Sequence, residues 1–284
     1  MLGTEPTVAC WACGAPSRPA DQFLPARYLC CSSCGFVFAP ERSAGELHEL
    51  YDADYFGDHA GGGDYAGQAA QRHHEAAVRI RFLRHFAPPP GRLLETGAAG
   101  GHFVAAATAA GYDVTGVEPV RVMAEQARAE LGVQLEVGFL EEVELAEGSF
   151  DVAVAFHVLE HIADPVAALE RMRAALRPGG LLVLEVPNVE SVAAQRGAAW
   201  GALEPLHHVG HYAPRSARAM LEKAGFALLH TETVPFFTYL RPAAKVRPTH
   251  LAHRLALSAR ARVAFRGPHP SRHELLRVVG RAAG

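Results

Sequence analysis

The sequence has no cysteine after residue 34, because all five of its cysteines lie within the first 34 residues. A secreted protein held together by disulfides spreads its cysteines through the fold, so this distribution excludes that class and favours a metal site in a reducing compartment. The sequence also lacks any run of the ~18–20 apolar residues that a membrane-spanning helix requires. Its first residues, MLGTEPTVACWACG, show neither the basic nor the apolar stretch of a secretory leader. We therefore expect a cytoplasmic protein.

Net charge is also low, at −3, and acidic residues are scarce near the C-terminal end. Residues 241–284 hold ten Lys and Arg against one acid, Glu274. A protein that coats nucleic acid presents a basic face across its main domain, so this composition makes nucleic acid an unfavoured partner. The sequence is 49% hydrophobic and 20% charged, which provides a sizeable core and excludes whole-chain disorder.

The cysteines form two C-x-x-C pairs, Cys10 with Cys13 and Cys31 with Cys34, each followed by glycine. Each pair lets two thiolates bind one ion, and together they supply the four sulfurs that tetrahedral Zn²⁺ prefers. A redox pair or a disulfide is the less favoured alternative. Cys30 is the spare cysteine, since Cys31 has the better spacing. We expect a structural zinc ribbon, and we favour a structural or partner-docking role for it over nucleic-acid binding.

The sequence divides into three expected parts: a zinc ribbon over 1–40, a connecting helix and Gly-rich loop over 41–67, and a large domain over 68–284. Strand-like and helix-like segments alternate in the large domain, which predicts a parallel sheet with helices on both faces. Expected strands cover 92–96, 113–117, 135–137, 152–156, 181–186, 227–233 and 275–280. Expected helices cover 68–86, 102–110, 165–176 and a segment ending at 128, and 176–180 is expected to be a turn.

A Gly-rich turn follows the first of these strands, and an acid ends the second. The turn reads Glu95-Thr-Gly97-Ala-Ala99-Gly-Gly101, and the acid is Glu118. Small residues let the backbone approach a ligand, and such a carboxylate accepts hydrogen bonds from ribose hydroxyls. The turn resembles motif I of the class I S-adenosylmethionine-dependent methyltransferases, with Ala99 in place of the middle glycine.

The resemblance extends along the large domain. Gly116-Val-Glu118-Pro resembles motif II, and Gly138-Phe139-Leu140-Glu141 occupies the position of motif III, with Phe139 where an acid often meets adenine. It implies a Rossmann-like, seven-stranded methyltransferase sheet behind a small zinc-ribbon module. The ribbon, the segment 50–56 and Pro187-Asn188 narrow the resemblance to bacterial methyltransferases of sugar, polysaccharide and natural-product pathways. The cofactor-binding residues that the resemblance implies are Glu95, Gly97, Ala99, Gly101, Glu118, Phe139, Leu140 and His157.

Histidines gather in two places. The string His157-Val-Leu-Glu160-His161 matches H-x-x-E-H of one class of zinc peptidases, but it follows a buried strand rather than lying on a helix. It also resembles the E-x-x-E-H string of ubiquinone-pathway O-methyltransferases, which implies a divalent cation at the active site. His157 replaces the first acid, so metal dependence stays open. A second cluster, His207, His208 and His211, lies where the family has its substrate loop.

These observations predict a methyltransferase that O-methylates a small hydroxylated acceptor such as a sugar or natural-product intermediate. We expect His161 or His208 to be the base, because the pKa of histidine suits proton transfer near pH 7, and His157 to position cofactor or substrate. An rRNA base methyltransferase with a zinc module and a non-catalytic cofactor-binding partner subunit remain as alternatives. The acceptor, the atom methylated and the oligomeric state stay open.

The basic end of the sequence gives one more expectation. Residues 236–268 should form an insertion with a helix over 251–265, ahead of the last strand. Three roles are open for its arginines, Arg254, Arg260 and Arg262. They could be solvated on a helix that packs against the domain, they could bind an anionic acceptor such as a nucleotide-linked sugar, or they could contact a membrane surface.

Overall fold

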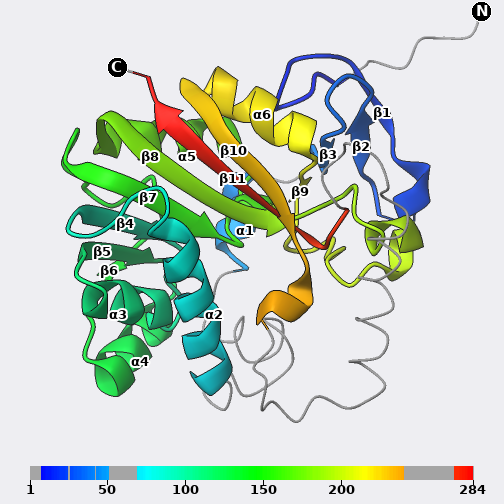
Figure 1. The fold of residues 1–284 in the computed structure, drawn as a ribbon. Coiled ribbons are helices and arrows are strands. Elements are labelled where there is room, and N and C mark those ends of the chain that lie inside the picture. The colour runs from blue at the N-terminus through cyan, green and yellow to red at the C-terminus, as the bar shows by residue number, and fades with distance from the viewer. Residues whose placement is uncertain (1–7, 25, 42, 51–68, 240–271, 284) are drawn as a thin grey trace, which may run out of the picture.

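The centre of the computed structural model, which describes residues 8–24, 26–41, 43–50, 69–239 and 272–283, is a seven-stranded sheet (Figure 1). Its strand order is β10-β11-β8-β7-β4-β5-β6. The five strands from β8 to β6 are parallel, whereas β11 runs antiparallel to both β8 and β10. The seven-stranded methyltransferase sheet is confirmed, and it is mixed, because the parallel part that the sequence predicts is joined by the antiparallel strand β11. The strands are β4 (Arg92–Thr96), β5 (Asp113–Glu118), β6 (Glu136–Val137), β7 (Phe150–Phe156), β8 (Leu176–Pro187), β10 (Phe226–Val234) and β11 (Leu275–Ala282).

Helices cover both faces of this sheet. Helices α2 (Ala69–Leu83) and α3 (His102–Ala109) pack on one face, with α4 (Arg121–Leu131) beside α3. Helices α5 (Pro165–Ala175) and α6 (Pro214–Lys223) pack on the other. The strands supply both layers because successive side chains point to opposite faces. Thus Val152 and Val154 of β7 join the α2–α3 core, and Ala153 and Ala155 join the α5–α6 core.

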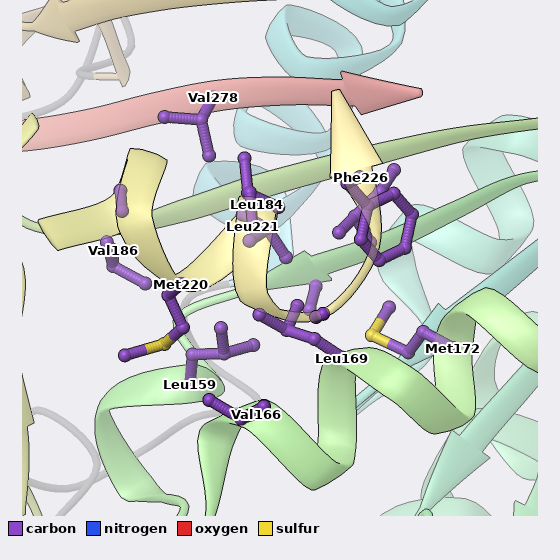
Figure 2. Packing of buried hydrophobic residues seen from close by; sticks show 14 of the residues in the cluster. Leu159, Val166, Leu169, Met172, Leu184, Val186, Met220, Leu221, Phe226 and Val278 are labelled. Carbon is purple, nitrogen blue, oxygen red and sulfur yellow. The ribbon is translucent and has the colours of Figure 1, made fainter. Parts of the chain in front are cut away.

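The core on the α5–α6 face is built from facing apolar side chains. Figure 2 shows Leu169 and Met172 of α5 opposite Met220 and Leu221 of α6, with sheet residues such as Leu184 beside them. Leu169 and Met172 have no exposed surface, and burying a side chain of this size contributes about 1.5–3 kcal/mol. This core continues without a break to Leu159, so it also supports the loop that carries the histidines.

Local boundaries differ from expectation in three places. Strand β8 begins at Leu176, directly after α5, so the expected turn over 176–180 belongs to the strand, where its pairing with β7 is irregular. Helix α4 continues beyond Arg128 to Leu131, and Gly132 caps it in the left-handed conformation that suits a helix end. Helix α2 ends at Leu83, before the expected end at residue 86.

The N-terminal module is a second, four-stranded sheet of order β1-β2-β3-β9 (Figure 1). Its first strands are β1 (Ser17–Pro19), β2 (Leu29–Cys31) and β3 (Val37–Phe38). The fourth, β9 (Gly210–His211), comes from the large domain and pairs antiparallel with β3. No sequence pattern predicted this strand. Residues 1–40 therefore share their sheet with a strand of the large domain.

Helix α1 (Ala44–His48) follows the module, as expected, and starts with a capping box between Ser43 and Glu46. At the other end of the chain, β11 is the last strand of the large sheet, as the sequence predicted. The expected helix over 251–265 and its three arginines lie outside the described residues, as does the Gly-rich loop. Among the described residues, no helix is both long and apolar enough to cross a membrane.

Candidate active site

A cleft of about 770 Å³ lies at the carboxyl ends of β4, β5 and β7, where open α/β sheets bind ligands. It brings together residues from both histidine-bearing segments and from the Gly-rich turn. Of the residues singled out in the sequence, Glu95, Gly97, Ala99, Glu118, Phe139, Leu140, His157, His161 and His208 line this one cleft. Gly101 does not line it, and neither do His207 and His211.

Gly97 and Gly101 are required for different reasons. Both have left-handed φ angles, +71° and +72°. A Cβ at Gly97 would lie 2.5 Å from Val158 Cγ2 at the cleft, whereas a Cβ at Gly101 would collide with Ala127 and Val133. Gly97 therefore shapes the cleft, and Gly101 lets helix α3 pack against its neighbours.

Glu118 ends strand β5 with its carboxylate buried in the cleft. The carboxylate accepts hydrogen bonds from the backbone N–H of Ala99, at 2.7 Å, and of Val120, at 2.9 Å. Burial raises the pKa of Glu118 to about 6, and these two hydrogen bonds oppose the rise. Lone pairs remain on a carboxylate that accepts only two bonds, so the group can still accept hydroxyl donors from a ligand.

Glu95 is the second buried acid of the cleft. Its Oε2 atom has no hydrogen-bond partner among the described residues, and burial raises its pKa well above the ordinary range. Because an unpartnered buried carboxyl oxygen is costly, a ligand group that donates to it would be favoured. S-adenosylmethionine carries an ammonium group and two ribose hydroxyls, so the pair Glu95 and Glu118 fits that cofactor.

The loop after β6 forms one wall of the cleft. The ring of Phe139 stacks on His48 of α1 with centroids 3.5 Å apart, and His48 Nε2 lies 2.9 Å from Glu141 Oε1. Arg171 of α5 holds the same loop by donating to the backbone carbonyls of Leu140 and Val143. Phe139 and Glu118 thus line the same cleft, with His48 stacked on the Phe139 ring. The sequence offered no signal for His48 or Arg171.

His157 follows β7 in the left-handed conformation, at φ +58°, which is uncommon for a residue other than glycine. Its Nδ1 lies 3.2 Å from Glu160 and its Nε2 lies 3.6 Å from Glu185. Burial lowers the pKa of His157, but the two carboxylates outweigh it and raise the pKa to about 9. His157 is therefore a cation at neutral pH, with both ring nitrogens facing carboxylates.

Glu185 anchors a buried ionic cluster behind His157. Its carboxylate accepts from Arg79 of α2, at 2.9 Å, from Arg277 of β11, at 2.7 Å, and from the hydroxyl of Tyr239. Burial raises the pKa of Glu185, yet the arginines and His157 hold it well below the ordinary range. Buried charges are stable only when paired in this way. A glutamate within the apolar run LLVLEVP was the one sequence signal for this cluster, and sequence reasoning missed it.

The rings of His161 and His208 meet edge to face, with centroids 4.5 Å apart. Burial, and then the neighbouring His208, lower the pKa of His161 to about 3, so His161 is neutral. The Nδ1 of His208 lies 2.8 Å from the carbonyl oxygen of Ala202. Since a carbonyl only accepts, Nδ1 carries a proton, which leaves Nε2, 3.9 Å from Glu204 Oε2, as the ring nitrogen that can exchange one.

Among the described residues, two groups of side chains have metal-binding geometry. One is formed by Glu160, His161 and His208, whose ligand atoms lie within 4.8 Å of one another, close enough to share a divalent cation. The other consists of Cys10, Cys13, Cys31 and Cys34. The sulfurs of Cys10 and Cys34 are 3.6 Å apart and those of Cys13 and Cys31 are 3.5 Å apart. Tetrahedral zinc with ~2.3 Å bonds separates its sulfurs by ~3.8 Å, so these four thiols fit the ion.

We predict that the purified protein contains about one zinc per chain, bound by these four cysteines. Cys30 is outside the group, and its sulfur points to the carbonyl of Cys31. Metal analysis should therefore find zinc retained in Cys30→Ser and lost in Cys31→Ser. The reverse result would exchange the two cysteines, and a wild-type protein without metal would remove the site.

Comparison with known proteins identifies relatives of the large domain. A model of the methyltransferase domain matches residues 69–231. Malonyl-[acyl-carrier protein] O-methyltransferase of Methylococcus capsulatus is 30% identical over 179 residues, 59% of this chain and 63% of the relative. Ubiquinone biosynthesis O-methyltransferase of Xanthomonas axonopodis pv. citri is 31% identical over 118 residues, 39% of this chain and 49% of the relative. The chain thus spans less than two thirds of the length of each.

Solved structures share the architecture. An S-adenosylmethionine-dependent methyltransferase from Thermotoga maritima aligns with a TM-score of 0.55 at 19% identity, covering 77% of this chain and 94% of that one. Another from Mesorhizobium loti aligns with a TM-score of 0.53 at 21% identity, covering 73% and 99%. At these identities the likeness shows a common fold.

Proposed function

The chain belongs to the class I S-adenosylmethionine-dependent methyltransferases, and on that premise we propose that it methylates an oxygen atom of a small hydroxylated acceptor. The observation that carries the proposal is the state of His208. Its Nδ1–H is held by the carbonyl of Ala202, so Nε2 is the nitrogen that can exchange a proton, and the residue lines the cleft. A histidine fixed in this tautomer can accept a proton from a hydroxyl nucleophile.

The other two histidines take supporting roles in this proposal. His161 packs edge-on against His208, and its lowered pKa makes it a poor proton acceptor. His157 already carries its proton at neutral pH, so it cannot act as the base. Its positive charge instead favours negative charge that develops on the acceptor oxygen. We therefore choose His208 as the base and assign His157 to electrostatic positioning.

The part of the cleft lined by Glu95, Glu118, Phe139 and Leu140 is here called the cofactor lobe, and the part lined by His161 and His208 the acceptor lobe. The cofactor lobe orients the donor. When bound, S-adenosylmethionine supplies an electrophilic methyl group on a sulfonium. Glu118 would accept hydrogen bonds from its ribose, Glu95 would pair with its ammonium, and Phe139 and Leu140 would contact its base. The ionic cluster around Glu185 fixes the position of His157 at the cleft. Alignment of the reactants supplies much of the acceleration in such a transfer.

Small acceptors are the class that the relatives favour. Two of them are O-methyltransferases, acting on a malonyl-[acyl-carrier protein] and in ubiquinone biosynthesis. The cleft, at about 770 Å³, is also of the size that holds small ligands. A nucleotide-linked sugar remains part of the proposal, although the arginines suggested to recruit it lie outside the described residues.

The proposal can be tested with methyl-labelled S-adenosylmethionine and four acceptor panels: phenols, hydroxylated sugars, carboxylic acids and bulk RNA. We expect label in the phenol or sugar panel only, and none with Glu118→Ala. Label in RNA would instead support a base methyltransferase. Cofactor binding without transfer to any panel would support a non-catalytic subunit. Each assay is repeated after chelation and with added Mg²⁺, which decides whether Glu160, His161 and His208 hold a required cation.

A further inference from the structure

The segment that carries the proposed base is held from two sides. Residues 207–212, here called the histidine segment, run between the zinc ribbon and the loop after β7. On the side of the large domain, the N–H of Val209 donates to the carbonyl of Glu160 at 2.7 Å, and the hydroxyl of Tyr212 donates to Leu159 at 2.9 Å. These contacts fix the segment relative to His157 and His161.

The zinc ribbon holds the opposite side of the same backbone. The hydroxyl of Tyr28 donates to the carbonyl of His208 at 2.7 Å, and the N–H of Ala39 donates to the carbonyl of Val209 at 2.9 Å. Strand β9 then pairs with β3, with His211 opposite Val37. The backbone carbonyls of His208 and Val209, which are successive in the histidine segment, thus both accept hydrogen bonds from the ribbon.

His211 shows how completely the segment is built into the ribbon. Its side chain has no exposed surface, and neither ring nitrogen has a hydrogen-bond partner among the described residues. Its ring packs instead against Tyr28, at 5.1 Å between centroids, Trp200, at 5.2 Å, and Phe23, at 6.4 Å. His211 is therefore a packing residue, and His208, three residues earlier, is the member of the segment that reaches the cleft.

The metal and the cleft are connected through this sheet. Cys31 is the last residue of β2, and Tyr28 stands just before that strand. Strand β2 pairs with β3, and β3 pairs with β9. When the four thiols bind zinc, they fix the ribbon, and Tyr28 and β3 are both parts of that ribbon. The core also continues from Cys31, Phe36 and Phe38 to Tyr212 and Leu159.

We propose that the zinc ribbon is a structural part of the acceptor site: it holds the histidine segment through Tyr28 and the β3–β9 pairing, so that His208 faces the cleft. Tyr28 is then a positioning residue for His208. The inference rests on the proposed function for the role of His208, but the placement of His208 by the ribbon is tested separately. No residue of β1, β2 or β3 lines the cleft, so loss of the Tyr28 hydroxyl should leave the affinity for the cofactor unchanged.

The test compares Tyr28→Phe with Tyr112→Phe, which removes a similar hydroxyl-to-carbonyl bond far from the cleft, to Ala87. Nitrogen-15 NMR of the labelled histidine rings reports the tautomer of His208, whose signals are assigned by their loss in His208→Gln. We expect the Nδ1–H form in wild type and in Tyr112→Phe, and a mixture of both tautomers in Tyr28→Phe. The affinity for S-adenosylmethionine should change by less than about two-fold in both variants.

Turnover provides the second readout once an acceptor has been found. Tyr28→Phe should lower kcat by about three- to ten-fold, as expected for the loss of one neutral hydrogen bond, with cofactor affinity retained. Removal of zinc by a chelator should change the His208 signals in the same direction and further. If chelation unfolds the whole chain, the His208 signals and the kcat of Tyr28→Phe alone test the proposal.

Unchanged His208 signals in Tyr28→Phe would overturn the proposal. Loss of cofactor affinity equal to the loss of kcat would also overturn it, because the ribbon would then support the whole fold rather than the acceptor side. If no acceptor panel is methylated, the proposed function fails, but the NMR result still shows whether the ribbon places His208.

Discussion

Replacing His208 with glutamine should lower kcat by about 10²–10⁴-fold, the usual contribution of a general base. Glutamine retains a side chain that can bond to Ala202 but cannot accept a proton at neutral pH. The affinity for S-adenosylmethionine, measured by calorimetry, should stay within about two-fold of wild type, because Glu95 and Glu118 lie in the other lobe of the cleft. The effect should therefore appear in turnover alone.

His207→Gln is the matched control for this variant. His207 is adjacent in sequence and also buried, but it does not line the cleft. It should retain wild-type turnover to within about three-fold. Equal losses in His207→Gln and His208→Gln would mean that the segment tolerates no substitution, and normal turnover in His208→Gln would remove it as the base. His161→Gln would then be the next variant to measure.

Glu118→Ala should weaken S-adenosylmethionine binding by about 10–150-fold, which corresponds to the ~1.5–3 kcal/mol of a hydrogen bond to a charged group. The carboxylate lies at the end of β5 and is the acceptor that the ribose hydroxyls would meet. Glu136→Ala, at an exposed position of the neighbouring strand β6, is the control and should bind normally. Calorimetry that finds equal affinity for Glu118→Ala and wild type would contradict the assignment of this lobe.

The pH dependence of cofactor binding follows from the same carboxylate. Burial raises the pKa of Glu118 to about 6, so the group becomes protonated as pH falls through that value. A protonated carboxyl loses acceptor capacity for ribose hydroxyls, so affinity should fall as pH drops through about 6 and level off above about pH 7. Glu118→Gln should bind weakly and lack this step. A step near pH 6 that persists in Glu118→Gln would assign it to another group.

Local patterns were sufficient to predict most of the fold. Alternating strands and helices, the Gly-rich turn and the two C-x-x-C pairs each reflect constraints between residues close in sequence. Strand β9 escaped prediction because two residues carry no periodic signal and their partners, Val37 and Phe38, lie in another module. The antiparallel direction of β11 was not predicted for a related reason. The direction of a strand depends on the path of the chain that connects it to its neighbours, and the sequence does not reveal that path.

The candidate site was predicted in part for the same physical reasons. Residues on the turn and at strand ends were found because parallel strands bring their carboxyl ends to one edge. The ionic cluster was missed because Arg79 and Arg277 look like ordinary surface charges in sequence. Glu185 was its only signal, since a carboxylate in an apolar strand must find buried partners. The contact of Tyr28 with His208 could not be predicted, because it joins two modules through one hydrogen bond.

The most direct test of the central claim is to identify the atom that receives the methyl group. The enzyme is incubated with S-adenosylmethionine carrying a carbon-13 methyl and with the acceptor found in the phenol or sugar panel, and the product is examined by NMR. The chemical shift of the labelled carbon distinguishes a methyl on oxygen from one on nitrogen or carbon. We predict an O-methyl product that is formed by wild type and is nearly absent with His208→Gln. A methyl on carbon or nitrogen, or an O-methyl product formed equally fast by His208→Gln, would contradict the account.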